Sequence, residues 1–376
     1  MSIPIRQQLK VASYIIGKKL KGEKKYALTL MLEPLFQCNL ACPGCGKIDY
    51  DSHILKQRMT YEECMRAVDE CGAPMVSLAG GEPLIHKDIK EIVEGFIAKG
   101  KYVYLCSNAI LLEKKLDLFK PSEQLTFSIH LDGMRERHDE SVGRVGVFDI
   151  ATSAIREAKR RGFRVNINTT LFTTANPDEV AEFFSFATND LKVDGITFSP
   201  GFAYEHAPRQ DVFMGRRESK EMMRQIFTNK KTNHRKWSLS QSSLFLDFVC
   251  GNQGYQCTPW SMPCRNVFGW QKPCYLLVDE GYEPTWNDLL KNTNWEGYGV
   301  GRNPKCANCM AHCGFEGTAT NDAIAHPLKA LWVSLRGPKL TGPYATDPPL
   351  LYDATPKPQH VPHSNVPIAH FGGIQH

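Results

Sequence analysis

The sequence predicts an α/β protein built on a partial (βα)6 barrel. Short β-rich runs alternate with helical patterns six times between residues 28 and 200. Basic residues followed by glycine, as at Lys99-Gly100 and Arg161-Gly162, are typical of the helix ends between such runs. Repeated alternation implies parallel strands joined by right-handed crossovers, and an open α/β sheet is the alternative. Either fold gathers functional groups at the C-terminal ends of its strands.

The predicted elements follow in chain order. Strands are expected at about 29–36, 75–79, 102–106, 125–131, 164–171 and 195–200, with helices near 60–71, 87–99, 112–119, 147–161 and 177–189. The barrel so defined occupies residues 28–200, after a basic amphipathic segment at 1–27. Residues 201–336 form a helical and cysteine-rich module, with two helices over 215–250. The tail at 337–376 is rich in proline and histidine and is expected to be extended or disordered.

Composition indicates a cytoplasmic protein. The chain has 376 residues, of which 42% are hydrophobic and 23% charged, values typical of soluble proteins. It holds no apolar run of about eighteen residues, and its N-terminus does not resemble a secretory signal. Thirteen cysteines in a cytosolic chain indicate metal ligands, catalytic thiols and small core residues rather than disulfides.

The first 25 residues concentrate positive charge. Seven basic residues face only one acidic residue, Glu23, within a partly helical apolar pattern. One interpretation is a packed N-terminal helix with solvated lysines. The other is peripheral contact with the anionic inner leaflet of the cytoplasmic membrane, where each basic residue contributes about 1 kcal/mol. Nucleic acid is not an expected partner, because the rest of the chain is not basic.

Three cysteines, Cys38, Cys42 and Cys45, follow the first strand directly. A tetrahedral zinc site needs a fourth ligand, for which His53 is the nearest candidate. A 4Fe–4S cluster held by three cysteines instead leaves one iron open to a small chelating molecule.

The run "CNLACPGC" resembles the cysteine motif of radical S-adenosylmethionine (SAM) enzymes. This resemblance implies that the open iron binds SAM as a co-substrate and that an electron from the cluster releases a 5′-deoxyadenosyl radical. The run "GGEP" (Gly80, Gly81, Glu82 and Pro83) resembles the turn that contacts the methionine amino group in that family. Taken alone, such a run is as well explained by an ordinary tight turn.

The same resemblance implies further SAM contacts, in chain order. Asn108 follows strand three in "CSNA", and Ser128 lies on strand four in "SIHLDG". Arg144 is a candidate partner for the methionine carboxylate, and its alternative is an exposed surface arginine. Asn166 and Asn168 alternate on strand five, so both face one way, towards the ribose.

Two positions near these contacts have other interpretations. Asp132-Gly133 is interpreted as a structural turn. Gly44 stands where the family commonly has an aromatic residue, so the ring against adenine must come from elsewhere, with Phe36 and Tyr50 as candidates.

The runs "FGWQKPCYLL" (268–277) and "NPKCANCMAHCGFE" (303–316), with the basic N-terminus, resemble the hopanoid-biosynthesis branch of these enzymes. The resemblance implies that the adenosyl radical adds to the terminal alkene of diploptene, a triterpene lipid. It also implies a reductase such as flavodoxin or ferredoxin as electron donor. Residues 202–214 and 244–249 could line an apolar pocket or belong to the core.

The radical left on the lipid must then be reduced, and a thiol is a good hydrogen-atom donor. Cys106 ends strand three beside Asn108, so it is the candidate hydrogen donor. The alternative is a small buried core residue, the usual role of a free cysteine.

A second cysteine group, Cys306, Cys309 and Cys313, joins Cys274 or, as an alternative ligand, Cys264. It resembles the auxiliary-cluster modules of related enzymes and predicts a second 4Fe–4S cluster or a zinc site, with His312 as a further ligand. No role is predicted for Cys250 or Cys257. Two alternatives to the lipid enzyme stay open: an auxiliary-cluster enzyme that abstracts hydrogen from a peptide or small molecule, and a non-catalytic zinc or iron–sulfur protein.

Overall fold

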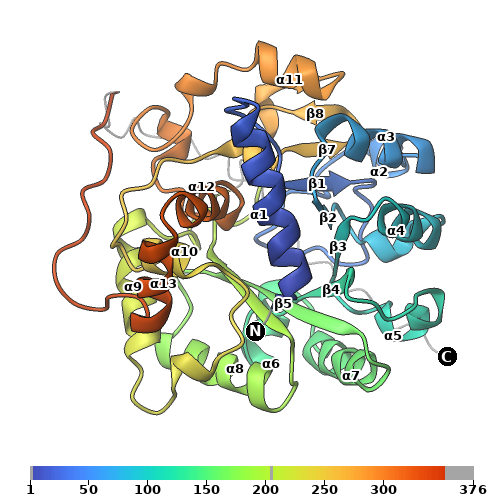
Figure 1. Ribbon diagram of the computed structural model, residues 1–376. Helices are drawn as coiled ribbons and strands as arrows, with labels where there is room; N and C mark the ends of the chain where they lie inside the picture. Colours follow the sequence, from blue (N-terminus) through green and yellow to red (C-terminus); the bar gives the residue numbers. More distant parts are fainter. Residues whose placement is uncertain (1–2, 204–205, 352–376) are drawn as a thin grey trace.

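Six parallel strands form the partial barrel in the computed structural model, which describes residues 3–203 and 206–351 (Figure 1). They are β1 (Thr29–Glu33), β2 (Met75–Leu78), β3 (Tyr102–Ser107), β4 (Leu125–His130), β5 (Arg164–Leu171) and β6 (Gly195–Pro200). Each strand pairs in parallel with the next one in the sequence. The predicted fold class is therefore confirmed. β1 is shorter than predicted because Pro34, which lacks an N–H donor, follows it.

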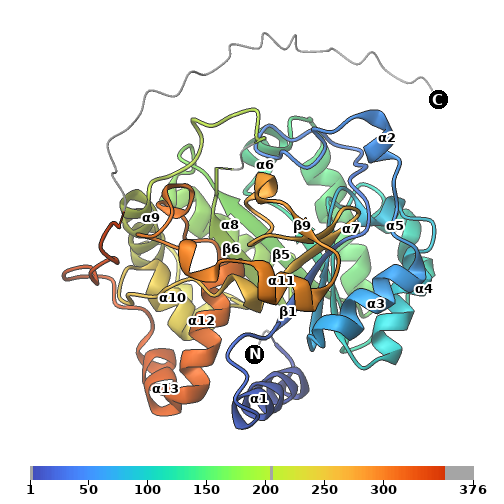
Figure 2. The ribbon, with the colours of Figure 1, turned by 90° about the horizontal axis from the view of Figure 1, so that it is seen from above.

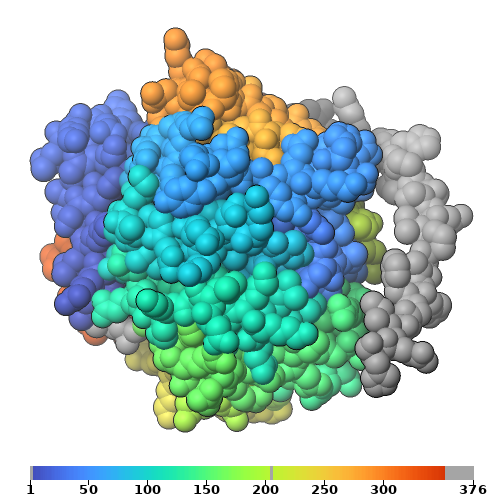
Figure 3. Space-filling model, turned by 90° about the vertical axis from the view of Figure 1, so that its right-hand side faces the viewer, coloured from blue at the N-terminus to red at the C-terminus, as the bar shows by residue number. Residues whose placement is uncertain are grey.

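Helices between the strands cover the outside of the barrel, and Figure 3 shows them as a continuous layer. They are α2 (Ser52–Leu55), α3 (Tyr61–Cys71), α4 (Ile89–Ala98), α5 (Leu112–Lys115), α6 (Arg135–Val142), α7 (Val147–Arg160) and α8 (Pro177–Asn189). Local signals set their ends: Thr60 and Glu63 form a capping box before α3, and Asn176 accepts the N–H of Asp178 at 2.8 Å before α8.

The C-terminal region extends the same sheet. Strand β7 (Cys264–Asn266) pairs in parallel with β1, and β8 (Gly269–Gln271) and β9 (Tyr282–Glu283) follow as antiparallel neighbours. Its helices are α9 (Arg216–Thr228), α10 (Ser243–Val249), α11 (Trp286–Asn292), α12 (His312–Ala325) and α13 (Pro327–Arg336). The module predicted at 201–336 is thus continuous with the barrel sheet, and its buried side chains join the same hydrophobic core.

Helix α1 (Ile5–Leu20) lies across the end of the barrel where the strands begin (Figure 1). Val11 and Ile15 pack against Tyr26 and Leu28, just before β1. The Gln7 amide donates to the Tyr104 hydroxyl at 2.8 Å. The N-terminal helix is therefore packed on the barrel, as one of the two interpretations predicted.

Residues 337–351 contain no helix or strand, and the rest of the predicted tail, 352–376, lies outside the described residues. Within the described part of the chain, no helix has the length and apolar character needed to cross a membrane.

Candidate functional site

A cavity of about 1450 Å³ runs along the inside of the barrel. Its lining includes Thr29 and Met75, which begin β1 and β2, and Asn108 and Thr170 near the opposite ends of β3 and β5. The cavity thus follows the strands over their length, about 20 Å for a strand of six residues. It is larger than the roughly 300–1,000 Å³ of most small-molecule pockets.

The cysteine triad lies in the loop after β1, and all three thiols belong to the cavity wall. The backbone N–H of Leu40 donates to the Cys38 sulfur at 3.4 Å, and that of Lys47 donates to Cys45 at 3.5 Å. Burial, and then the charges of Cys45 and Cys38, raise the pKa of the Cys42 thiol. Deprotonation here calls for a positive metal centre, so the donor set fits a 4Fe–4S cluster.

The GGEP turn packs against this cysteine loop. A Cβ atom on Gly80 would overlap the Leu35 carbonyl, and one on Gly81 would overlap the Gln37 carbonyl. Gly80 also has a φ of 107°, which favours glycine. Both glycines line the cavity, so their small size lets the turn approach the cysteine loop and the cavity at once.

Glu82 and Pro83 are not among the residues that line this cavity. Glu82 is buried, and its carboxylate accepts the Leu84 N–H at 3.0 Å, the Asn108 N–H at 2.9 Å and the Ser107 hydroxyl at 3.1 Å. Burial raises its pKa to about 7 in spite of these donors. Glu82 therefore ties the turn after β2 to the turn after β3 and acts on the cavity through Asn108.

Polar side chains from neighbouring strands meet on the cavity wall. Ser128 lies directly between Cys106 and Asn166 in the strand register, and all three line the cavity with Asn108 and Asn168. The Asn166 side chain accepts the Ser240 hydroxyl at 2.7 Å and donates to Thr197 at 3.1 Å. These predicted contact residues are thus brought to one cavity.

Cys106 presents a protonated thiol to the same cavity. Its sulfur lies 3.4 Å from the Ser77 hydroxyl. Burial raises the pKa of the thiol, although hydrogen bonds from Ser77 and Ser128 oppose the shift. The S–H bond that a hydrogen-atom donor needs is therefore retained at neutral pH.

Two cavity residues escaped sequence reasoning. His130 and Asp132 form an ion pair at 3.0 Å on the cavity wall, and Asp132 also accepts the Thr170 N–H at 2.8 Å. Burial disfavours both charges, yet their attraction raises the pKa of His130 and lowers that of Asp132. The two-residue period from Ser128 to His130 was the signal that could have found the histidine.

The aromatic wall also differs from the candidates. Phe36 and Tyr50 stack on each other 4.9 Å apart, and neither lines the cavity. Phe172, which follows β5, does line it and packs against Phe213. A Cβ on Gly44 would lie 3.1 Å from the Phe172 ring, so the missing side chain at 44 leaves room for this aromatic residue.

Arg144 is exposed in the turn between α6 and α7 and does not line the cavity. Its backbone N–H donates to the Asp139 carbonyl at 3.0 Å. The structure therefore favours the alternative interpretation of Arg144 as a surface residue.

A second thiol group surrounds a small cavity of about 30 Å³ in the C-terminal module. Its members are Cys257, Cys274, Cys306, Cys309 and Cys313, and Cys313 also lines the central cavity. Cys257, for which no role was predicted, fits beside α12 because Gly314 has no side chain that would overlap its sulfur. Five buried thiols offer more than the four ligands of a 4Fe–4S cluster, so the donor set fits one.

The other predicted ligands lie elsewhere. The Cys264 thiol donates to the Glu33 carboxylate at 3.4 Å and is not part of the second cavity. His312 lines the central cavity, and burial lowers its pKa to about 4. Across the described ranges, no three His, Cys, Asp or Glu side chains come close enough to hold a single metal ion, and the zinc alternative stays a prediction.

Comparison with known families agrees with this site. Residues 32–187 match the model of the radical SAM superfamily, and residues 196–333 match a domain of unknown function, DUF3463. GTP 3′,8-cyclase of Clostridium perfringens (strain SM101 / Type A) is 29% identical over 157 residues, 40% of this chain and 49% of the relative. That of Thermodesulfovibrio yellowstonii is 26% identical over 202 residues, 51% and 62% of the two chains. The chain spans about half the length of the first of these relatives.

Solved structures show the same fold. SuiB of Streptococcus suis, bound to the precursor peptide SuiA, gives a TM-score of 0.57 at 17% identity over 73% of this chain and 66% of that chain. The enzyme anSMEcpe with bound AdoMet gives 0.55 at 15% identity over 82% and 96%. The chain is therefore a radical SAM superfamily member whose barrel is followed by a DUF3463 domain.

Proposed function

We propose that this radical SAM enzyme is an adenosylhopane synthase, which adds the 5′-deoxyadenosyl radical to the terminal alkene of diploptene. The observation that carries the proposal is the Cys106 thiol, which lies on the wall of the cavity that the cysteine triad also lines. The sequence resemblance to hopanoid-biosynthesis proteins supplies the lipid class. The cavity volume of about 1450 Å³ leaves room for a large hydrocarbon beside the SAM co-substrate.

Residues on the cavity wall would hold the co-substrate. Gly80 and Gly81 lie next to the triad loop, and Asn108, Ser128 and Asn168 supply polar groups at the strand ends. When bound, the 4Fe–4S cluster on Cys38, Cys42 and Cys45 supplies the electron that splits SAM into methionine and the adenosyl radical. Phe172 and Phe213 provide an apolar wall beside these groups.

The remaining chemistry conserves atoms and electrons. The 5′ carbon bonds to the terminal alkene carbon as the π bond opens, which leaves a tertiary carbon radical on the lipid. The S–H bond of Cys106 then breaks and a C–H bond forms, leaving a thiyl radical. A reductase such as flavodoxin or ferredoxin supplies one electron, and solvent supplies the proton, to restore the thiol.

An anaerobic reaction with SAM, reductant and diploptene in detergent, followed by mass spectrometry, tests the proposal. The wild-type protein should yield a hopane that carries the whole adenosyl group, with one deuterium at the quenched carbon in D₂O because a thiol exchanges its hydrogen. Cys106→Ala should lose this product, whereas Cys64→Ala, in the hydrophobic core, should keep it. Formation of 5′-deoxyadenosine and methionine alone would contradict the lipid assignment.

A second candidate is an auxiliary-cluster enzyme that abstracts hydrogen from a peptide or small molecule. The five-thiol group supports it, because Cys313 joins this group to the central cavity. The fold likeness to SuiB bound to a precursor peptide supports it too. This enzyme would release 5′-deoxyadenosine in proportion to product and would not attach the adenosyl group, so the same assay separates the two candidates.

A further inference from the structure

Helix α13 exposes an apolar face. Leu328 is 80% exposed, Trp332 and Leu335 are each 65% exposed, and Leu331 is 56% exposed. Residues three and four apart share one face of a helix, so these four side chains form a continuous stripe. Val333 is buried on the opposite face. Soluble proteins rarely leave such a stripe open to water unless it binds something.

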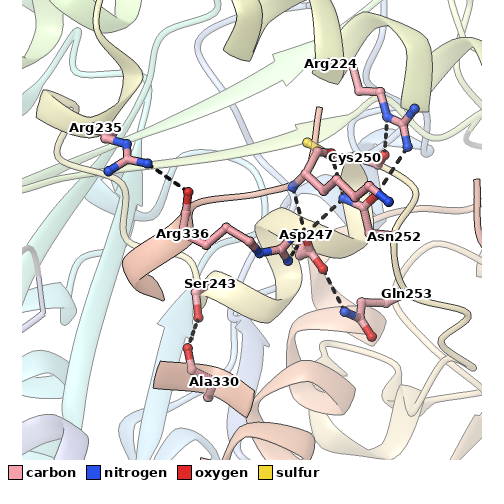
Figure 4. A network of polar contacts seen from close by, with 10 residues as sticks. Arg224, Arg235, Ser243, Asp247, Cys250, Asn252, Gln253, Ala330 and Arg336 are labelled. Atoms are coloured by element: carbon pink, nitrogen blue, oxygen red, sulfur yellow. Dashed lines mark hydrogen bonds and ion pairs between the residues drawn. The ribbon is translucent and has the colours of Figure 1, made fainter. Parts of the chain in front are cut away.

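The orientation of this stripe is fixed by polar contacts on the inner side of α13 (Figure 4). The buried carboxylate of Asp247, on α10, accepts Arg336 at 3.2 Å and the backbone N–H of Lys339 at 3.1 Å. The Ser243 hydroxyl donates to the Ala330 carbonyl at 3.1 Å, and Arg235 donates to the Arg336 carbonyl at 2.9 Å. The helix therefore cannot turn its apolar stripe inward without breaking these bonds.

Helix α1 has a similar outer face. Ile5, Leu9, Ile16 and Leu20 are exposed and recur at one or two helical turns, whereas Val11 and Ile15 are buried against the barrel. Figure 2 shows α1 and α13 projecting on the same side of the molecule. Two separate segments of the chain thus present apolar stripes in one direction.

Basic residues surround both stripes. They are Arg6, Lys10, Lys18, Lys19 and Lys21 on or next to α1, and Lys329, Arg336, Lys339, Arg235 and Lys236 on or next to α13. Residues 327–339 contain no acidic residue, and the same holds for 230–236. Apolar stripes framed by lysine and arginine complement an anionic lipid surface, because hydrocarbon takes the stripes and headgroups take the charges.

The central cavity reaches this side of the protein. Gln8 and Ala12 of α1, Ile324 of α12 and Ser334 of α13 all belong to its lining. The same cavity extends to the cysteine triad at the other ends of the strands. A hydrocarbon that enters between these helices would therefore travel inside the barrel towards the reacting groups.

We propose that α1 and α13 together form a docking face for an anionic bilayer, with the strand N-terminal end of the barrel towards the membrane. The docking itself is independent of the reaction. The corollary that a lipid enters the central cavity between the two helices rests on the proposed function.

Vesicle binding tests the docking face without any substrate. The full chain should sediment with vesicles of phosphatidylglycerol and phosphatidylcholine, and at least tenfold less with pure phosphatidylcholine or in 0.5 M salt. Leu331→Ser with Leu335→Ser should lower binding at least tenfold, and Ile16→Ser with Leu20→Ser should do the same. The matched control is Val145→Ser, which is 91% exposed in the turn between α6 and α7 and should bind like the wild type.

The position of Trp332 gives a second readout. Brominated lipids should quench the fluorescence of the wild type but much less that of Trp332→Phe. Equal binding by wild type and serine variants would overturn the docking face, as would dimerisation through α13 in place of vesicle binding. If vesicles bind but no adenosylated lipid forms, the proposed function fails and the docking face stands. If both hold, the α13 variant should lose turnover of diploptene in vesicles and keep it in detergent, and equal losses would overturn the entry route.

Discussion

The buried carboxylate of Glu82 accepts the backbone N–H of Asn108 at 2.9 Å, and the Asn108 side-chain amide approaches the Cys38 sulfur at 3.8 Å. One carboxylate thus links the turns after β2 and β3 to the cysteine triad. Glu82 is a positioning residue in this arrangement, because it does not itself line the cavity.

Glu82→Gln should weaken SAM binding through Asn108. Its amide would turn an N–H donor towards Asn108 or Ser107, both of which donate to the carboxylate now. Loss of one such bond to a charged acceptor costs about 1.5 kcal/mol, or roughly tenfold in the Kd for SAM. Calorimetry on the reconstituted protein measures the Kd, and iron content should stay unchanged. Glu91→Gln, exposed on α4, is the control, and equal affinities would refute the positioning role.

Cys257→Ala should lower the iron content of the anaerobically reconstituted protein. If the five-thiol group holds a second 4Fe–4S cluster, the wild type binds about eight irons per chain and the variant moves towards four. Cys264→Ala should not change the count, because its thiol contacts Glu33 rather than the second cavity. Zinc in place of iron at this group, found by elemental analysis, would establish the alternative prediction instead.

Cys257 also shows where sequence reasoning stopped. The barrel could be predicted because strand and helix periods repeat locally, and each predicted strand lies within a few residues of an observed one. Cys257 lies far along the chain from Cys306 and meets it only through the packing of α12 at Gly314. No local spacing encodes that contact.

Strands β7 to β9 and the outer cavity wall escaped prediction for the same reason. Two or three residues per strand are too few to show a two-residue period. Phe172 reaches the cavity because Gly44, on a different loop, leaves space for its ring. Arg144 was chosen by resemblance in a motif, and its position depends on the turn between α6 and α7. Contacts between distant loops therefore decided these cases.

Asp247→Ala should destabilise the C-terminal module. Its buried carboxylate accepts from Asn252 at 2.9 Å and Gln253 at 2.7 Å, as well as from Arg336 at 3.2 Å. Removing one partner of a buried charge pair costs about 3–5 kcal/mol, and urea denaturation would measure it. Asp69→Ala breaks the surface pair with Lys99 and should cost less than about 1 kcal/mol. A similar small loss for both variants would show that α13 is held by its apolar contacts instead.

His138 should make stability depend on pH below neutrality. Its side chain is fully buried, Nδ1 accepts the Asp132 N–H at 3.3 Å, and Nε2 has no partner within the described chain. Burial, and then the nearby His130, lower its pKa to about 4. Between about pH 6.5 and pH 4 the unfolded chain therefore binds a proton that the folded chain does not, so stability falls with pH.

The expected loss from this histidine between pH 7 and pH 5 is about 2 kcal/mol. His138→Asn keeps an acceptor for the Asp132 N–H but cannot titrate, so its free energy of unfolding should fall by about that much less over the same interval. Urea denaturation of matched anaerobic samples at both pH values gives the comparison. His53→Asn, on the exposed α2 segment, should follow the wild type. If His138→Asn and the wild type lose stability in parallel, another buried group governs the acid response.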